Sequence, residues 1–548
     1  MLFSEEENSS TIRAIFLTGK SENLIPQGRP EMRGIQIMDL EVPGNVEMLK
    51  AILQPYLGRK FDVPTVVEVK EKILLYYQNQ KNSFVGIEVP QQKTIGRTLQ
   101  IVVSKKQFGV PIYKGETWYT DEQMNLYLGI APRQDIVEDN LQNNLSWMNR
   151  NPFHYSVAKF IPGEEPGVID LEVVTRTRRP IRLYGRADDT GSATTGYGRF
   201  ASGFSWGNAF WVGDILTFEY GCSNEFPRYQ SYMANYTSFL PWQHLLLVFG
   251  NYASVKPNIP DSSPGTDNSA QSAQLYLHYT IPLKPLYKAF KQELLFGLEY
   301  KNTNSNGVAL TPSGVETILA PGPLERKTQI ISQLYANYKF SNKMPHQNMN
   351  VSLDFYGSPG QWLPHQSNNT YDLMRKNSKN QYCYGFVTFS DLFTIPGIMN
   401  ISLLLRGQIS NSTLPSTELF NLGGYNTVRG YHEAELSTDN GFIGNLELRS
   451  LPISLWPKVG DQLIFLAFLD YAVGNNWFVP VIAGVDQTPP HTQYLLGVGP
   501  GLRYSINPYL QLRIDYGFKL HQLFTSDSAA RQLRLGFGQF HLGLLLSY

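Results

Sequence analysis

"LQLRIDYGFK", residues 510–519, alternates strictly between apolar and polar positions. In an extended chain this alternation puts all the apolar side chains on one face, namely Leu510, Leu512, Ile514, Tyr516 and Phe518. The same pattern recurs in "QLYLHYTI" (274–281), "ELLFGLEY" (293–300), "NVSLDFY" (350–356) and "MNISLLLRGQ" (399–408). Clusters of Pro, Gly, Asn and Ser separate these segments, so the sequence from residue 178 onward predicts a large antiparallel β structure.

Composition decides between two forms of such a structure. A soluble β-sandwich with one hydrated face is the alternative to a transmembrane barrel. Only 17% of the 548 residues are charged and 13% are aromatic. Many apolar, aromatic-rich segments over 178–548 favour the barrel, because strands can cross a bilayer only as a closed ring in which every backbone group is paired. No run of 18 apolar residues occurs, which argues against a transmembrane helix.

Before residue 178, helical and strand patterns alternate. "VVEVKEKILLYY" (66–77) places Val66, Val69, Ile73 and Tyr76 on one helical face. Thr120 and Gln123 have the spacing of a capping box at the start of a later helix. "TLQIVVS" (98–104), "HYSVAKFI" (154–161) and "VIDLEVV" (168–174) have the composition of strands. We therefore expect a tail at 1–10 and two small α+β units, at 11–105 and 106–177.

The last segment, "FHLGLLLSY" (540–548), again places its aromatic and leucine residues on one face. It resembles the C-terminal signal by which outer-membrane proteins are assembled, and the residues that would carry that signal are His541, Gly543, Leu546 and Tyr548. An ordinary edge strand is the alternative interpretation of this segment.

"GGYNTVRGY" (423–431), followed by "DNGFIGNLELR" (439–449), resembles the VRG(F/Y) loop and the next strand of the POTRA–β-barrel superfamily of outer-membrane polypeptide transporters. Three further stretches follow the order of two-partner secretion transporters (TpsB) of the haemolysin secretion/activation type (ShlB/FhaC/HecB). "IEVPQQKTIGRTLQIVV" (87–103) is similar to the end of their first POTRA domain, "LSWMNRNPFHYSVAKFIPGEEPGVIDLEV" (145–173) to the second, and "RPIRLYGRADDTG" (179–191) to the first barrel strand.

The resemblance implies a transmembrane barrel of about sixteen antiparallel strands at 178–548. Two POTRA domains, at 11–105 and 106–177, would precede it. A loop at about 422–441, carrying Val428, Arg429, Gly430 and Tyr431, would fold into the barrel. The family often plugs its pore with an N-terminal helix, but the roughly ten residues before Thr11 are too few for a helix that spans a barrel. The sequence therefore departs from the family at this point, and it does not identify the segment that closes the resting pore.

A single charge stands out in "LIFLAFLDYAVG" (463–474), and it is Asp470. Alternation places Asp470 on the inward face with Leu466 and Phe468, where an unpaired carboxylate is costly and a guanidinium can bind it bidentately. The resemblance implies that Arg429 is this partner. Glu447, inward by the parity of its neighbours, is a second acceptor. The alternative is that Arg429 is a solvated loop charge.

Signals for catalysis are weak. "GFSWG" (203–207) matches G-x-S-x-G, but the sequence continues as strand, so we expect Ser205 to be a barrel residue. The nine histidines show no metal-binding spacing, and Cys222 and Cys383 are too few for a disulfide scaffold. We expect two free thiols; the alternative is a disulfide between them if they lie close in space. We predict no enzyme, no cofactor and no metal.

The resemblance implies secretion of one large, unfolded exoprotein, usually a β-helical adhesin or cytolysin, across the outer membrane of a Gram-negative bacterium. POTRA domains in the periplasm would capture it by strand addition, with contacts expected at Phe153, Tyr155, Ser156, Val157 and Ala158. Further expected partners are outer-membrane lipid and the barrel-assembly machinery. Equal numbers of basic and acidic residues, 46 each, give no pull toward nucleic acid, and we expect a monomer.

Two other functions are open at this point. An insertase for outer-membrane proteins would share the loop but usually carries three or more POTRA domains. A passive porin would have no need of the first 177 residues.

Overall fold

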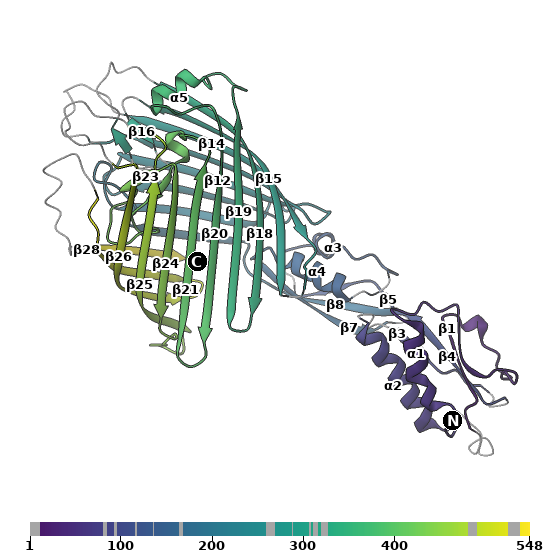
Figure 1. The fold of residues 1–548 in the computed structure, drawn as a ribbon. Coiled ribbons are helices and arrows are strands. Elements are labelled where there is room, and N and C mark those ends of the chain that lie inside the picture. Colours follow the sequence, from purple (N-terminus) through teal and green to yellow (C-terminus); the bar gives the residue numbers. More distant parts are fainter. Residues whose placement is uncertain are drawn as a thin grey trace. The chain divides into compact units, whose positions relative to one another are not determined.

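The computed structural model describes residues 11–80, 85–92, 96–115, 118–134, 136, 138–163, 168–258, 269–287, 289–305, 308–310, 316–318, 327–479, 490–523 and 538–548. The chain divides into two compact units, Met1–Arg179 and Pro180–Tyr548 (Figure 1). The tail expected at 1–10 lies outside the described residues. Each unit is built around its own sheets.

The first unit begins with a four-stranded sheet in the order β2-β1-β4-β3. β1 pairs in parallel with β2 and β4, and β3 closes the edge antiparallel to β4. The helical face predicted at Val66, Val69, Ile73 and Tyr76 is confirmed, because all four side chains are buried in α2. The elements are β1 (Ala14–Thr18), β2 (Gly34–Met38), α1 (Val46–Leu53), α2 (Val63–Asn79), β3 (Val85–Glu88) and β4 (Thr98–Lys105).

A second small sheet follows in the same unit. Its central strand is β8, with β7 antiparallel on one side and the short β5 and β6 parallel on the other. The capping box predicted at Thr120 and Gln123 is confirmed, with both of its hydrogen bonds present. The elements are β5 (Gln107–Phe108), β6 (Ile112–Lys114), α3 (Asp121–Leu128), α4 (Glu138–Met148), β7 (His154–Pro162) and β8 (Val168–Thr177).

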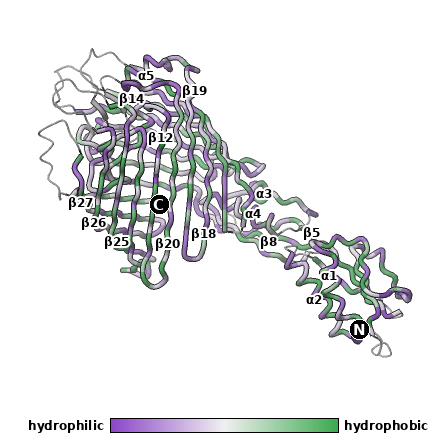
Figure 2. Tube along the Cα trace, in the orientation of Figure 1, coloured by the Kyte–Doolittle hydropathy of each residue, from purple (hydrophilic) through white to green (hydrophobic). Residues whose placement is uncertain are grey.

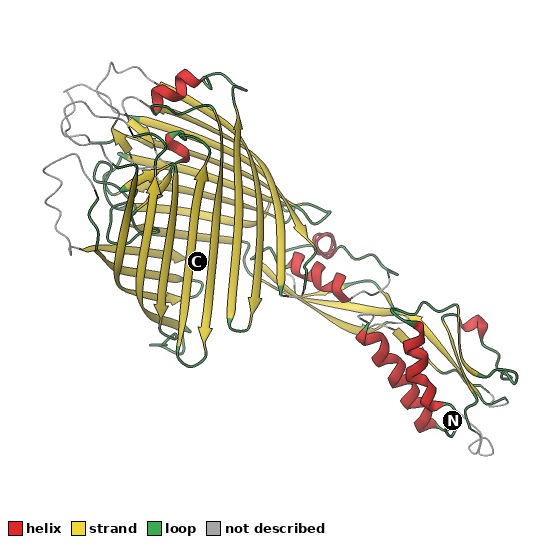
Figure 3. Cartoon of the chain, in the orientation of Figure 1, coloured by secondary structure: helices red, strands yellow, loops and turns green. Residues whose placement is uncertain are grey.

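The second unit is a closed antiparallel barrel of sixteen strands, in which the last strand pairs with the first. Figure 3 shows how completely strands dominate this unit, with α5 (Asn368–Met374) in one connection. The strands are β9 (Ile181–Asp188), β10 (Arg199–Ala209), β11 (Asp214–Ser223), β12 (Tyr229–Phe239), β13 (Leu245–Val255), β14 (Ala270–Leu283), β15 (Phe290–Ser305), β18 (Lys327–Met344), β19 (Gln347–Pro359), β20 (Gln381–Ile395), β21 (Met399–Ser410), β24 (Asn440–Arg449), β25 (Asp461–Asn475), β26 (Thr492–Ile506), β27 (Leu510–Lys519) and β28 (Gly538–Ser547). Two short hairpins, β16 (Val308–Leu310) with β17 (Glu316–Ile318) and β22 (Phe420–Leu422) with β23 (Leu436–Thr438), lie in connections.

Hydrophobic and hydrophilic residues alternate along the barrel strands, as the colours of Figure 2 show. Because successive side chains of a strand point to opposite faces, this alternation separates the outer wall from the lumen. In β25 the side chains of Phe465, Leu469 and Tyr471 are exposed on the outer wall, whereas those of Phe468 and Asp470 are buried. A barrel in lipid requires this pattern, because its outer face must be apolar while its backbone is paired within the ring.

Three other features bear on function. Ser205 lies within β10, where its hydroxyl is 2.9 Å from that of Thr217 on the next strand, as expected for a barrel residue. Cys222 and Cys383 are free thiols. Among the helices that the structure describes, none is long and apolar enough to cross a membrane.

One buried histidine distinguishes the second small sheet. The His154 side chain is 4% exposed and packs against the rings of Tyr119 and Tyr127. Within the described part of the chain, neither ring nitrogen has a hydrogen-bond partner. Burial lowers the pKa of His154 from 6.5 to about 4, because the charged imidazolium loses its hydration.

We therefore expect acid to destabilise this unit between about pH 6.5 and pH 4. Above pH 6.5 neither state binds the proton. Below it the unfolded state does and the folded state does not, so about 3 kcal/mol of folding free energy is lost by pH 4. Denaturant unfolding of Met1–Arg179 at several pH values measures this loss. His154→Phe keeps the aromatic packing, and its stability should depend less on pH by that amount. Parallel pH profiles of the two proteins would exclude His154 as the origin.

Candidate functional site: the seat of the lumenal loop

The connection between β21 and β24 runs from Asn411 to Asp439 and contains the β22–β23 hairpin. Its tip, Val428–Tyr431, is buried, with Val428 and Tyr431 both 0% exposed. These two side chains join a hydrophobic cluster with wall residues of β24, β25 and β26, namely Ile443, Ala472 and Leu495. The loop therefore lies against the inner wall of the barrel.

Arg429 is held mainly by Asp470 of β25. Its Nε and Nη2 donate to the two carboxylate oxygens at 2.7 Å each, and its backbone N–H donates to the same carboxylate at 3.0 Å. Arg429 is 2% exposed and Asp470 is 0% exposed. This is the bidentate geometry that makes arginine–carboxylate pairs strong and directional.

The remaining face of the guanidinium is also occupied. Nη1 donates to Glu447 of β24 at 2.6 Å, and the guanidinium carbon lies 3.5 Å from the centre of the Phe468 ring. Asn445 helps to orient the carboxylate of Asp470, because its side-chain amide donates to that carboxylate at 2.8 Å. All three nitrogens of the Arg429 guanidinium thus donate to a carboxylate.

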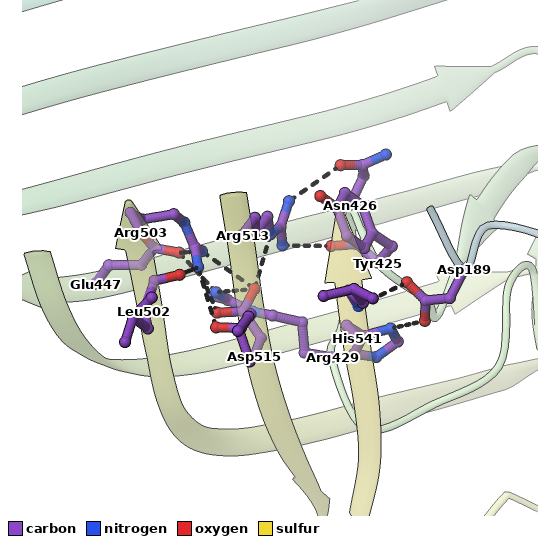
Figure 4. A network of polar contacts seen from close by, with 12 residues as sticks. Asp189, Tyr425, Asn426, Arg429, Glu447, Leu502, Arg503, Arg513, Asp515 and His541 are labelled. Carbon is purple, nitrogen blue, oxygen red and sulfur yellow. Dashed lines mark hydrogen bonds and ion pairs between the residues drawn. The ribbon is translucent and has the colours of Figure 1, made fainter. Parts of the chain in front are cut away.

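A third carboxylate, Asp515 of β27, was not expected from the sequence. Arg503 and Arg513 bind it at 2.7 Å each, and Arg429 Nη1 lies 3.6 Å from it (Figure 4). Arg449 and Arg503 also approach Glu447, at 2.6 Å and 3.5 Å. The network thus joins three carboxylates and four arginines. In "LQLRIDYGFK" the alternation places Arg513 and Asp515 on the polar face of the strand. Alternation predicts the face on which a side chain lies, but it does not predict which residues of other strands that side chain contacts.

Backbone fit seats the tip as closely as charge does. Gly430 has φ +95°, a conformation that glycine adopts without strain, and a Cβ there would lie 2.8 Å from the carbonyl oxygen of Gly517 in β27. A Cβ on Gly517 would in turn collide with Gly430 N, and one on Gly497 of β26 with the carbonyl of Arg429. The two wall glycines clear the space that the tip occupies, a role that their sequence context did not indicate.

The stem of the loop has its own anchors. Glu418, 4% exposed, accepts from Lys301 at 2.8 Å and from the hydroxyl of Tyr384 at 2.6 Å. At the far end, both oxygens of Asp439 bind the guanidinium of Arg375, which follows α5. Cations on two other segments therefore fix both ends of the connection, independently of Arg429.

The C-terminal strand presents its signal residues on two faces. Leu546 and Tyr548 are exposed on the outer wall, at 51% and 80%. His541, 1% exposed, points into the lumen, and Gly543 faces the same way against the Tyr425 ring.

The five cargo-contact candidates separate in the same manner. Tyr155 and Val157 are exposed, at 60% and 47%, on the open face of the second small sheet, and Ala158 is half-buried. Phe153 and Ser156 are buried, at 7% and 2%.

Comparison with known proteins assigns the chain to a family. Residues 167–474, more than half of the chain, match the family described as "Haemolysin secretion/activation protein ShlB/FhaC/HecB". The chain belongs to this family. A relative in Haemophilus influenzae (strain 86-028NP), the heme/hemopexin transporter protein HuxB, is 20% identical over 86% of this chain and 80% of its own.

Solved structures of the same architecture agree with the fold. CdiB from Escherichia coli superposes with a TM-score of 0.70 at 14% identity, over 98% of this chain and 90% of its own. CdiB from Acinetobacter baumannii gives 0.61 at 18% identity, over 100% of this chain and 92% of its own.

This member of the ShlB/FhaC/HecB family is an outer-membrane transporter that secretes an exoprotein partner, with its POTRA domains in the periplasm. The family is one of transporters and not of enzymes. Since β9 enters the membrane from the periplasm, the connection Asn411–Asp439 leaves the membrane on the extracellular side before it turns back into the lumen. Within the described ranges, no group of three or more His, Cys, Asp or Glu residues is arranged to hold a metal ion.

Arg429→Ala should release the tip without preventing barrel assembly. It leaves the buried carboxylate of Asp470 without a cation, at a cost of about 3–5 kcal/mol. Arg429→Lys should rescue only in part, because an ammonium cannot make the paired fork. We expect outer-membrane insertion to persist, secretion to fall, and protease to cut the loop faster. Arg186→Ala is the matched control, since that side chain is 51% exposed in its pair with Glu219 and its loss should matter little.

Asp470→Ala should resemble Arg429→Ala, and the double variant should be no worse than either, because the shared interaction is already absent. Additive defects would contradict the pairing.

Gly517→Ala tests the backbone seat separately. The new methyl group would displace Gly430, so protease sensitivity of the loop should rise although every charge is retained. Gly250→Ala in β13 is the control, because nothing lies within 4 Å of a Cβ built there. Wild-type loop protection in Gly517→Ala would show that the ion pairs alone hold the tip.

Proposed function

We propose that this transporter captures its unfolded exoprotein as an added strand on the edge of β7, and passes it through the lumen after the loop tip leaves its seat. The observation that carries the first step is the open edge of β7. Within the described residues, β7 pairs with β8 and with no other strand. An exposed edge presents backbone donors and acceptors to any extended chain with little demand on its sequence.

Register identifies which groups are available. Arg178 N–H donates to the carbonyl of Phe153. The backbone N–H and C=O groups of odd-numbered residues of β7 therefore bond to β8, whereas those of even-numbered residues point away from β8. The backbone groups of Ser156 point away from β8, but they are already bonded: its N–H donates to Asn149 Oδ1 at 2.7 Å and its carbonyl accepts from Asn149 Nδ2 at 2.9 Å. The side chain of Asn149 thus blocks that position. Ala158 is the next outward-pointing residue along the strand.

The open face of the sheet beside this edge is amphipathic. Tyr155 and Val157 lie opposite Arg176 and Val174 of β8, and Lys159 lies opposite Glu172. An added strand would continue this face with alternate side chains of its own. Tyr155, Val157 and Ala158 are therefore the cargo contacts that we propose, whereas Phe153 and Ser156 support them from the buried side.

The lumenal seat supports the second step. The tip occupies the inner wall through one arginine, two glycines and a small apolar cluster, so removing it requires no rearrangement of the strands. We infer that extended cargo and seated tip compete for the same space, and that transport needs no catalytic centre in this chain.

The cargo we propose is a β-helical adhesin or cytolysin, as the resemblance implies. We further propose that the chain works as a monomer in outer-membrane lipid, and that the barrel-assembly machinery reads the outward face of β28 at Leu546 and Tyr548. His541 and Gly543 would serve the barrel interior instead.

Ala158→Pro tests strand addition. Proline removes the outward N–H of Ala158 while the pairing of neighbouring residues with β8 is retained. We expect cargo release into the medium to fall severalfold with outer-membrane levels unchanged, and crosslinks from β7 to cargo to disappear. Ala158→Ser, which keeps the N–H at similar size, should secrete normally. Normal secretion by Ala158→Pro, or cargo crosslinks confined to α3 and α4, would contradict capture at this edge.

A further inference from the structure

The seam that closes the barrel is incompletely paired. β28 pairs with β9 from Ser547, opposite Tyr184, to Gly543, opposite Asp188. On its other side β28 continues along β27 as far as Gly538, opposite Phe518. In the described part of the chain, no residue of β9 pairs with 538–542, so the extracellular end of β28 extends past its partner.

A side chain continues the ladder at this point. Asp189 directly follows β9, and the register puts it opposite Leu542. Its Oδ1 accepts from the backbone N–H of Leu542 at 3.1 Å, where a backbone carbonyl would accept in a longer strand. Its Oδ2 lies 2.7 Å from Nδ1 of His541. One carboxylate thus fixes both the first free backbone donor and an inward side chain of β28.

The second ring nitrogen of His541 contacts the loop. Gly430 N–H donates to Nε2 at 3.3 Å. Nδ1 faces the carboxylate of Asp189 (Figure 4). Both contacts require a neutral imidazole that carries its proton on Nδ1. Because His541 is 1% exposed, no bulk water competes for either nitrogen.

A second contact between the loop and the seam strand supports this link. Tyr425 lies against Gly543, so closely that a Cβ on Gly543 would collide with its hydroxyl. The backbone carbonyl of Tyr425 accepts from Arg513 at 2.6 Å, which ties the same turn into the charge network. Two successive inward positions of β28 therefore bear on the loop.

We propose that His541 is a positioning residue that couples the seat of the loop tip to closure of the extracellular part of the β9–β28 seam. The tip holds Nε2, and this orients Nδ1 toward the carboxylate that closes the seam. When the tip leaves, the imidazole loses one of its two fixed contacts, and the seam loosens from its extracellular end, where Gly543 faces Asp188 and Leu544 faces Ala187. This coupling goes beyond cargo capture and does not depend on which exoprotein is carried.

Two reporters in one full-length protein measure the two ends of the link. Ala187 and Leu544 lie opposite each other across the seam, so Ala187→Cys with Leu544→Cys reports seam closure by the rate of disulfide formation. Val428→Cys, at a fully buried position, reports departure of the tip by its rate of maleimide labelling. Each is made in a Cys222→Ser, Cys383→Ser background and measured in outer-membrane vesicles.

The decisive variant is Arg429→Ala, which acts on the tip and touches neither β9 nor β28. Coupling of ordinary strength predicts that labelling at 428 rises and disulfide formation at the seam slows, each by roughly fivefold or more. Faster labelling with a wild-type seam would overturn the coupling while leaving the loop seat intact. His346→Ala, an exposed histidine in a turn, is the control and should change neither reporter.

Asp189→Asn separates the two contacts of the histidine. Its Oδ1 can still accept from Leu542, but its amide would donate to Nδ1, and this moves the imidazole proton to Nε2 opposite Gly430 N–H. The tip should then label faster although no side chain of the loop is altered. Wild-type labelling in both Asp189→Asn and His541→Gln would overturn the proposal.

Discussion

A guanidinium buried against the inner wall of a barrel must be neutralised where it lies, because water that would otherwise solvate it is excluded. Arg429 meets this constraint with Asp470, Glu447 and the ring of Phe468, and its backbone N–H uses the same carboxylate. Since these groups come from β24 and β25 in fixed register, only one position of the tip satisfies them all. The conformation of the loop follows from that position.

Several buried ion pairs hold the loop, at its stem as well as at its tip. Lys301 with Glu418 and Arg375 with Asp439 fix the stem, each pair joining segments far apart in the sequence. Ion pairs of this kind are directional but contribute little net stability once desolvation is counted, so they specify a position more than they strengthen it. Such anchors suit the loop movement that we propose, because directional ion pairs define a single position to which the loop can return.

The fold was predictable because strand alternation is a property of single segments. Asp470 could be assigned inward because it is the only charge in residues 463–474 of β25, and Glu447 because both of its neighbours are apolar. Asp515, Arg503 and Arg513 also alternate correctly, but nothing local says that β24 to β27 bring them to one level. Gly497 and Gly517 depend on a backbone more than sixty residues away in the sequence. The contacts of His541 could not be predicted from its own strand, because its partners Gly430 and Asp189 lie more than a hundred residues away in the sequence.

Two open β edges in this protein are treated in the same way. At β7 the amide of Asn149 occupies both backbone groups of Ser156, and at β28 the carboxylate of Asp189 occupies the N–H of Leu542. An unprotected edge can pair with any extended chain. A transporter of unfolded protein encounters such chains continually. A side chain can rotate away from an edge within nanoseconds, whereas a paired strand separates only with the loss of its whole ladder. Side-chain caps therefore limit pairing to the residues beyond them. At β7 the first outward backbone N–H beyond the Asn149 cap is that of Ala158. At β28 the capping carboxylate also contacts His541, whose other ring nitrogen accepts from Gly430 of the loop. The edge of β7 is therefore the one to which our proposal assigns the cargo.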